Sequence, residues 1–484
     1  MTKVKLEPAE VFACFAEINK IPRPSKKEEK MIEFLKNYGA KLGLETKVDE
    51  VGNVIIKKPA SKGFEDRETT IIQSHMDMVC EKDSGVKFDF MNDPIQTEID
   101  GEWLKAKGTT LGADDGIGVA MELAILKDDS IKHGPIECVF TRDEETQLTG
   151  ASGMKSGFMT GKYLLNLDSE DEGEIFISCA GGASTRATFH FNMEKPPLDY
   201  YFFKVGINGL TGGHSGDDIE KKRANANKLL VRFLYREMKK YDLRISDIQS
   251  GGLHNAIPRE GWTVCAVPME YKEQIRIDAN VFASEIEEEY SITEKSLNFY
   301  MESANAADVI ESGCAKKIIT SLQAVYNGVF AMCQDIDGLV ETSSNLASIH
   351  KKGNTIEIIT SQRSNIGSAR KNMSATVSAA FELAGADVFT TDGYPGWKLN
   401  PDSELLKLVV GAYERLFGIS PKVLAIHAGL ECGLFSEKYP HLDMVSFGPT
   451  LRGVHSPDEK LLIPTVKKAW DLLLEILKNI PKKK

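Results

Sequence analysis

The sequence of 484 residues has no long apolar run, no CxxC pair and no excess of positive charge. A helix that spans a membrane needs about 20 apolar residues, and no stretch approaches that length. The 59 Lys and Arg residues are outnumbered by 71 Asp and Glu residues, giving a net charge of −12. Because nucleic acids and anionic membranes are bound largely through positive charge, we expect neither as a partner, and a small molecule or peptide instead.

The eight cysteines are spread singly along the chain. Neither a disulfide framework nor a paired-cysteine metal site has such spacing, so we expect reduced, mostly buried thiols. The first residues also lack the basic start, apolar stretch and cleavage site of a signal peptide. These features predict a soluble, cytoplasmic protein.

The chain has the composition of a globular protein, with 42% hydrophobic and 27% charged residues, and is long enough for two or three domains. Apolar runs typical of strands, at residues 53–57, 69–73 and 136–141, alternate with helical patterns. Ser25 and Glu28 have the spacing of a capping box that would begin a helix. The alternation predicts an α/β sheet covered on both faces, with functional groups where strands run into loops.

The pattern changes in the middle of the chain, where two stretches each combine a long strand-like run with a helix. This change predicts an α+β domain inserted at residues 184–391. The first domain would then be discontinuous, formed by residues 1–183 and 392–484.

Residue types that bind metals follow the predicted strands, beginning with His75 and Asp77. The two-residue period of a strand places both on one face. Asp77 is then either a ligand or the carboxylate that orients His75 through its other ring nitrogen. Taken alone, the pair favours the simpler alternative of a histidine at a strand end that hydrogen-bonds a nearby carboxylate.

Four further segments carry similar residue types. Asp114 and Asp115 lie in a glycine-rich stretch before a predicted helix, and a helix cap is the simple alternative for them. Three adjacent acids at 143–145 follow a strand, where an exposed turn is the alternative. Asp168 ends another apolar run, and His455 lies in a loop rich in Gly and Pro. Five such segments with one chemistry are hard to explain by structure alone.

Together these segments supply two imidazoles and three carboxylates, which suits two metal ions sharing a bridging carboxylate, with zinc the leading candidate. Two divalent cations with three carboxylates retain one positive charge, which favours a bridging hydroxide that can attack a polarised carbonyl. A further carboxylate is needed as general base. Because Glu144 and Glu145 are adjacent, one can bind metal while the other faces the water. The five ligand candidates are His75, Asp114, Glu145, Asp168 and His455.

The order of these motifs resembles that of the di-zinc peptidases that include aminoacylases, carnosinases and glutamate carboxypeptidases. The resemblance extends over essentially the whole chain and is closest to the branch of bacterial dipeptidases that cleave unblocked dipeptides, Xaa-His among them. It is carried by residues 74–79, 111–118, 166–170, 172–176, 212–216, 255–260, 394–397 and 453–459.

The resemblance implies a mixed-sheet catalytic domain with an inserted α+β lid, and a role for each candidate. His75, Asp114 and Asp168 would bind one zinc ion, and Asp114, Glu145 and His455 the other, so that Asp114 bridges. Asp77 would orient His75, and Glu144 would be the general base.

For residues 184–391 the resemblance implies a lid that also forms a homodimer. In that lid His214 would stabilise the oxyanion, while Asn255 and Arg363 would bind the carboxylate of the substrate. An arginine suits this task because its planar, bidentate recognition of a carboxylate measures the length of a dipeptide.

Two positions depart from the pattern of the family. Gln147 stands where a glycine is usual, and Asp115 stands where the nearest relatives have Asn. An extra carboxylate at Asp115 would favour harder ions such as manganese or cobalt over zinc.

Three other functions are consistent with parts of the sequence. An amidohydrolase acting on N-acyl amino acids, or a tripeptidase or carboxypeptidase, would share the metal ligands and differ in the lid. A peptide-binding protein without activity would be expected to lack Glu144 or a ligand, and none is missing. A dinucleotide-binding loop at residues 112–118 is disfavoured because the GxGxxG pattern is absent.

Overall fold

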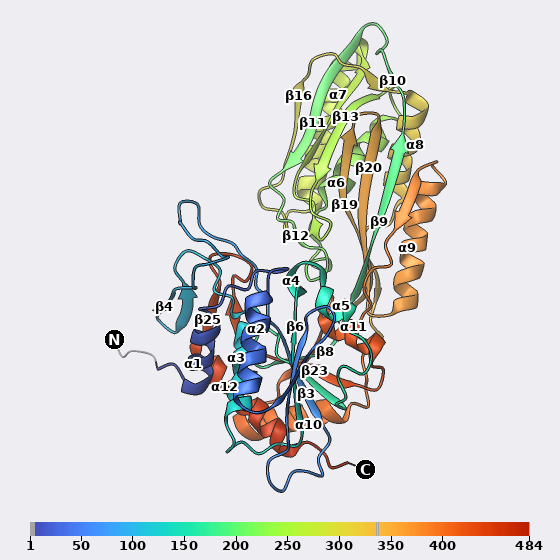
Figure 1. The fold of residues 1–484 in the computed structure, drawn as a ribbon. Helices are drawn as coiled ribbons and strands as arrows, with labels where there is room; N and C mark the ends of the chain where they lie inside the picture. The colour runs from blue at the N-terminus through green and yellow to red at the C-terminus, as the bar shows by residue number, and fades with distance from the viewer. Residues whose placement is uncertain (1–4, 335, 337, 484) are drawn as a thin grey trace. The chain divides into compact units, whose positions relative to one another are not determined.

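The computed structural model describes residues 5–334, 336 and 338–483. The chain divides into two compact units (Figure 1). Unit 1 consists of the residues up to Ser178, of Trp397–Ala425 and of the residues from Leu430 onward. Unit 2 consists of Cys179–Gly396 and Ile426–Gly429. Both units combine helices with sheets, so the α/β class expected from the sequence is confirmed.

Unit 1 is built on a mixed sheet with the strand order β1-β2-β6-β3-β7-β23-β8-β22. Strands β6, β3, β7 and β23 run parallel to one another. On one side β2 pairs antiparallel with β6 and β1 pairs antiparallel with β2, and on the other side β8 pairs antiparallel with β23. The strands are β1 (Glu45–Val48), β2 (Val54–Lys58), β3 (Thr70–His75), β6 (Ile136–Thr141), β7 (Tyr163–Asn166), β8 (Glu174–Cys179), β22 (Lys422–Ile426) and β23 (Asp443–Ser446).

Every residue of β3, β6 and β7 is buried, as expected for parallel strands with both faces covered. Figure 1 shows α1, α2 and α3 beside this sheet.

A smaller sheet has the order β24-β25-β5-β4. The remaining elements of unit 1 are α1 (Ala9–Ile18), α2 (Glu29–Lys41), β4 (Thr97–Asp100), β5 (Trp103–Ala106), α3 (Ala113–Lys127), α4 (Glu144–Gln147), α5 (Thr149–Gly153), α10 (Glu404–Phe417), α11 (Glu431–Lys438), β24 (Leu451–Arg452), β25 (Lys460–Leu462) and α12 (Ile463–Asn479).

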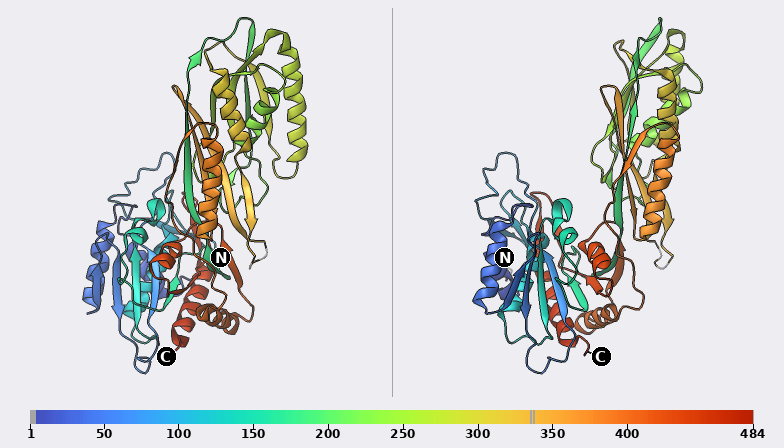
Figure 2. Two further views of the ribbon diagram at one scale, coloured as in Figure 1. Left: turned by 90° about the vertical axis from the view of Figure 1, so that its right-hand side faces the viewer. Right: turned by 45° about the vertical axis from the view of Figure 1, so that its right-hand side comes forward.

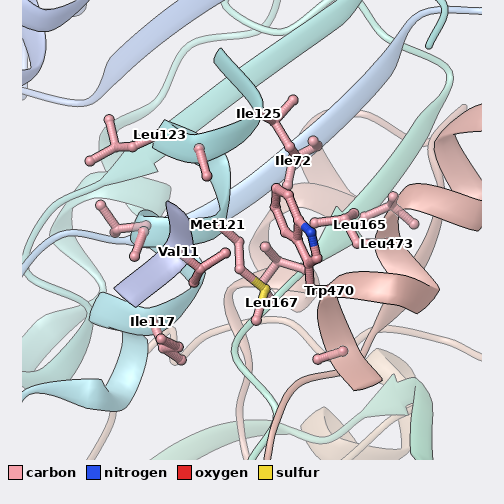
Figure 3. Close-up of a cluster of buried hydrophobic side chains, with 14 of the residues drawn as sticks. Val11, Ile72, Ile117, Met121, Leu123, Ile125, Leu165, Leu167, Trp470 and Leu473 are labelled. Atoms are coloured by element: carbon pink, nitrogen blue, oxygen red, sulfur yellow. The ribbon is translucent and has the colours of Figure 1, made fainter. Parts of the chain in front are cut away.

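The core of unit 1 joins helices from both ends of the chain to the central strands. Ile72 and Leu165 are register partners on β3 and β7, so they share one face of the sheet. Met121 of α3 and Trp470 of α12 pack into the same buried cluster (Figure 3). Burial of such side chains stabilises the fold by about 1.5–3 kcal/mol each, and it fixes the strands whose ends carry the candidate site.

Unit 2 contains a large antiparallel sheet with the order β16-β11-β15-β13-β19-β20-β9-β21, in which β18 also pairs with β19. Short strands form the pairs β10 with β17 and β12 with β14. The strands are β9 (Gly181–His190), β10 (Met193–Glu194), β11 (Tyr200–Asn208), β12 (Gly213–His214), β13 (Arg244–Gly251), β14 (Ala256–Ile257), β15 (Gly261–Pro268), β16 (Asn298–Ser303), β17 (Val309–Ile310), β18 (Gly328–Met332), β19 (Val340–Lys352), β20 (Thr355–Ser364) and β21 (Asp387–Thr390).

Helices cover one face of this sheet, as the views in Figure 2 show, and their apolar side chains form a second buried core. The helices are α6 (Ala226–Glu237), α7 (Lys272–Glu289), α8 (Ser312–Ala324) and α9 (Gly367–Glu382), with a 3₁₀ turn at Met269–Tyr271. In the part of the chain that the structure describes, no helix has the length and apolar character needed to cross a bilayer.

Candidate active site

The candidate ligands of unit 1 lie where neighbouring parallel strands end. Strand β3 ends at His75, β6 leads into Glu144 and Glu145 on α4, and β7 is followed by Asp168. Beyond β23, the loop between β24 and β25 contains His455. Because the carboxyl ends of parallel strands meet at one edge of a sheet, residues far apart in the sequence are brought together there.

Two groups of candidate ligands form at this edge, and in each group the ligand atoms lie within 4.8 Å of one another. The first group is His75, Asp114 and Asp168, and the second group is Asp114, Glu145 and His455. The two groups share Asp114. Its Oδ1 lies 3.1 Å from Nε2 of His75, and its Oδ2 lies 3.2 Å from Nε2 of His455. One oxygen of Asp114 therefore faces each group, which is the geometry of a bridging carboxylate.

The chemistry of these side chains fits divalent cations. Burial raises the pKa of Asp168 to about 6. It also raises the pKa of Glu145, and the nearby carboxylate of Asp114 adds to this rise. Buried carboxylates are costly to ionise unless positive charge compensates them. Nitrogen and oxygen donors in two groups of three, sharing one carboxylate, suit two borderline divalent ions.

Asp77 is placed to orient His75. Its Oδ1 lies 3.4 Å from Nδ1 of His75, the ring nitrogen that faces away from Asp114. The carboxylate is buried, and it also accepts hydrogen bonds from the backbone N–H groups of Glu144 and Glu145 at 3.1 and 3.3 Å. Asp77 therefore connects the end of β3 with α4. Of the two interpretations left open by the sequence, this geometry favours the orienting carboxylate.

The expected capping box at Ser25 and Glu28 is wrong. Helix α2 begins at Glu29 without a side-chain cap. The Ser25 hydroxyl instead donates to Oδ2 of Asp77 at 2.7 Å, and Glu28 is buried against Arg142. Both residues therefore support the strand ends rather than the helix.

A third set of carboxylates, formed by Glu28, Asp77 and Asp143, also lies within 4.8 Å. Each member already has protein partners. Glu28 is paired with Arg142, and Asp143 accepts hydrogen bonds from the hydroxyls of Thr146 and Thr149. These contacts make the set a structural network, and we assign no metal to it.

The adjacent side chains of Glu144 and Glu145 lie in different environments. Glu145 belongs to the second group, with Oε2 2.8 Å from Nε2 of His455. Glu144 belongs to neither group, and among the described residues its carboxylate has no hydrogen-bond partner. Burial raises the pKa of Glu144 well above its usual range, and the carboxylates of Asp168 and Glu145 contribute. A half-buried, unliganded carboxyl group with a raised pKa can both accept and return a proton.

The two departures from the family pattern lie outside both groups. Asp115 is buried, and its Oδ1 accepts a hydrogen bond from the N–H of Gly118 at 3.2 Å within the first turn of α3. Asp114 and Asp115 have non-helical backbone angles, and the peptide bond between them is cis. Gln147 is exposed at the end of α4.

Sequence reasoning missed a buried carboxyl group beneath this edge of the sheet. Oε2 of Glu431, at the start of α11, accepts hydrogen bonds from Gln73 of β3 and Thr141 of β6, both at 2.7 Å. Burial raises its pKa to about 8. Glu431 does not follow an apolar run directly, and its partner Gln73 lies 358 positions away in the sequence, so no local pattern indicates this contact.

Unit 2 holds a second candidate site around Arg363 on β20. This side chain is buried, with Nη2 3.2 Å from Nε2 of His214 and Nη1 donating to the hydroxyl of Tyr394 at 3.1 Å. No Asp or Glu of the described residues lies within ion-pair distance of it. A buried guanidinium without a carboxylate partner is costly, and it is suited to bind an anion presented by a ligand.

Two other residues of unit 2 lie near this arginine. Asn255 is exposed, and its carbonyl oxygen accepts a hydrogen bond from the N–H of Ser215 at 2.8 Å, which holds it beside the His214 loop. His427, which sequence reasoning missed, is buried with Nε2 2.8 Å from the Oγ of Ser343. Burial lowers the pKa of His427 to about 3, and the charge of Arg363 adds to this, so the imidazole is neutral.

Comparison with known proteins adds independent information. The profile described as peptidase family M20/M25/M40 matches residues 71–479. The cytosol non-specific dipeptidase of Escherichia coli K12 is 41% identical over 480 residues, which cover 99% of each protein. The crystal structure of aminoacylhistidine dipeptidase from Vibrio alginolyticus is 42% identical and superposes with a TM-score of 0.91 over 99% of this chain and 98% of that chain.

More distant structures share the fold alone. Aminopeptidase PepT from Bacillus cereus is 18% identical, with a TM-score of 0.58 over 97% of this chain and 98% of that one.

Proposed function

Because the chain belongs to peptidase family M20/M25/M40, we propose that it is a metal-dependent dipeptidase that hydrolyses unblocked dipeptides. The observation that carries this proposal is the pair of ligand groups sharing Asp114, with the unliganded Glu144 beside them. Identity of 41–42% over the full length to two dipeptidases supports the substrate class. An N-acyl amino acid hydrolase, a tripeptidase or a carboxypeptidase of the same family is the alternative.

Residues His75, Asp114, Glu145, Asp168 and His455 would hold two divalent ions, and we propose zinc, with manganese or cobalt as alternatives. When bound, the ions supply an activated water and polarise the carbonyl group of the substrate. Asp77 keeps Nε2 of His75 directed at the first group. The carboxylate of Glu144 accepts the proton of the attacking water and delivers it to the nitrogen of the leaving amine.

Unit 2 supplies the groups for recognition in this proposal. The guanidinium of Arg363, with Asn255, binds the carboxylate of the dipeptide, and His214 donates a hydrogen bond to the developing oxyanion. The support is the buried arginine without an acidic partner and its distance of 3.2 Å from His214. Recognition of a free carboxylate by this arginine would select substrates with an unblocked C-terminus.

Replacing Arg363 by Met is expected to raise KM for a dipeptide such as Ala-His roughly 100-fold, since a charge-assisted contact of a few kcal/mol is lost. Steady-state assays with Ala-His and its C-terminal amide would measure this effect. The amide should be a poor substrate for both proteins, because it lacks the anion that the arginine binds. Arg186→Met, at an exposed position on β9 of the same sheet, is the matched control. An unchanged KM in Arg363→Met would contradict the assignment.

The first test of the proposed activity is amino-acid release from Ala-His, β-Ala-His, Leu-Gly, matched tripeptides and N-acetylated amino acids. We expect cleavage of the free dipeptides alone, loss of activity with a chelator, and recovery with zinc, manganese or cobalt. Cleavage of only the acylated compounds would change the assignment to an aminoacylase. Absence of all cleavage after addition of metal would favour a binding protein.

We also propose that the protein forms a homodimer through unit 2 and is cytoplasmic. The family resemblance supports the first proposal, and the cytosolic location in the name of the Escherichia coli relative supports the second. Sedimentation equilibrium tests the dimer, and the mass of a single chain would disprove it.

A further inference from the structure

A buried glutamate holds the segment that leads to the shared ligand Asp114. Oε2 of Glu459 accepts hydrogen bonds from the N–H groups of Leu111 and Gly112 at 2.7 and 3.0 Å. Its Oε1 accepts from the N–H groups of Ala113 and Asp114 at 2.7 and 3.3 Å. Glu459 is only 2% exposed. A carboxylate with four successive backbone donors fixes both the position and the direction of that segment.

The first N–H groups of a helix have no partner within the helix and are usually satisfied by a nearby cap residue or by water. Here Gly112, at the start of α3, has no side chain to act as a cap, and the side chain of Asp115 accepts only the N–H of Gly118, beyond the non-helical residues Asp114 and Asp115. Gly112 has a φ of 65°, and a Cβ there would lie 2.6 Å from Nη2 of Arg23. The segment thus depends on a residue about 345 positions away in the sequence.

Arg23 holds the same segment from its carbonyl side. It is buried, and its guanidinium donates to the carbonyl oxygen of Gly112 at 2.7 Å and to that of Asp77 at 3.2 Å. Glu459 therefore binds the N–H groups of the segment while Arg23 binds a carbonyl group. Their opposite charges lie close enough to stabilise each other electrostatically.

Glu459 also belongs to the loop that carries His455. This loop joins β24 to β25, where Arg452 pairs with Lys460, and Glu459 is the last residue before β25. The side chain of His455 is 53% exposed, and its backbone has a φ of 62°. An exposed ligand on a loop needs support elsewhere to be held in place, and the buried carboxylate four residues later provides it.

We propose that Glu459 is a positioning residue that fixes the distance between His455 and Asp114, and so sets the metal affinity of the second group. This inference rests on the proposed metal centre. The first group also contains Asp114, but its imidazole lies on β3 and is oriented separately by Asp77. Loss of the Glu459 contacts should therefore weaken the second group more than the first.

Glu459→Gln is the variant that tests this role. A glutamine has nearly the same size, but it replaces one acceptor oxygen with an NH₂ group that faces backbone donors. Two of the four hydrogen bonds are lost. Asp458→Asn, at an exposed position in the same loop, is the matched control and should bind metal like the parent protein.

The measurement is a calorimetric titration of the metal-free protein with Zn²⁺, with metal content checked by elemental analysis. We expect two sites in the parent protein and, in Glu459→Gln, one site weakened roughly 10- to 100-fold, as is usual when residues supporting metal ligands are replaced. His455→Ala should weaken the same site. The other site should change by less than about threefold.

Unchanged binding in Glu459→Gln, or equal weakening of both sites, would overturn the proposal. If Glu459→Gln does not fold, as judged by circular dichroism, Glu459→Asp replaces it, since the charge is kept while the shorter side chain cannot reach all four donors. The same selective weakening is expected there, and its absence in the folded protein would also overturn the proposal. Failure of the parent protein to bind any divalent ion would instead contradict the proposed function.

Discussion

Replacing Glu144 by Gln is expected to reduce kcat by roughly 10³- to 10⁴-fold while two metal ions remain bound. The carboxylate belongs to neither ligand group, so metal binding does not depend on it. Its pKa is raised, first by burial, so it holds a proton more tightly than an ordinary glutamate, as suits a group that takes a proton and passes it on. A glutamine has similar shape but can neither accept nor return that proton.

Rapid kinetics and elemental analysis on the same preparations would test this prediction. KM should change little, because Glu144 does not contact the carboxylate of the substrate in the proposed mechanism. Gln147→Ala, at an exposed position on the same short helix, is the control for disturbance of α4. A Glu144→Gln protein that keeps most of its rate would show that another group is the general base. One that loses its metal would make Glu144 a ligand.

The location of the candidate ligands could be predicted from the sequence because it depends on local rules. An apolar run that ends in a polar residue marks the end of a buried strand, and the ends of parallel strands meet at one edge of a sheet. His75, Glu145 and Asp168 each follow such a run, and the structure brings them together. The assignment of Asp114 as the shared residue came from the family resemblance, and its two oxygens do face the two imidazoles.

The supporting contacts could not be predicted, since they join distant positions without any periodic pattern. Ser25 looked like a helix cap because a capping box is defined by local spacing alone, yet its hydroxyl binds Asp77, 52 positions away. Glu431 and Glu459 reach partners about 290 to 358 positions away. A glutamate buried beneath a site has the same sequence signature as one on the surface, and only the fold distinguishes them.

Replacing Asp114 by Asn is expected to have an equally large effect by a different route, namely loss of the metal pair. Each carboxylate oxygen of Asp114 faces one imidazole, Oδ1 that of His75 and Oδ2 that of His455. An asparagine offers one oxygen and one NH₂ group, and the NH₂ group cannot bind a cation. We therefore expect no more than one ion per chain.

Activity of Asp114→Asn should fall on the order of 10³-fold or more, since metal stabilisation of the transition state contributes several kcal/mol. Asp168→Asn is the informative comparison, because Asp168 belongs to the first group alone and its replacement should weaken only that site. Asp115→Asn is the matched control. Asp115 is buried and belongs to neither ligand group, and the change to Asn keeps the size of the side chain. Elemental analysis after dialysis at fixed free zinc would distinguish the three variants, and two ions retained in Asp114→Asn would exclude Asp114 as the bridge.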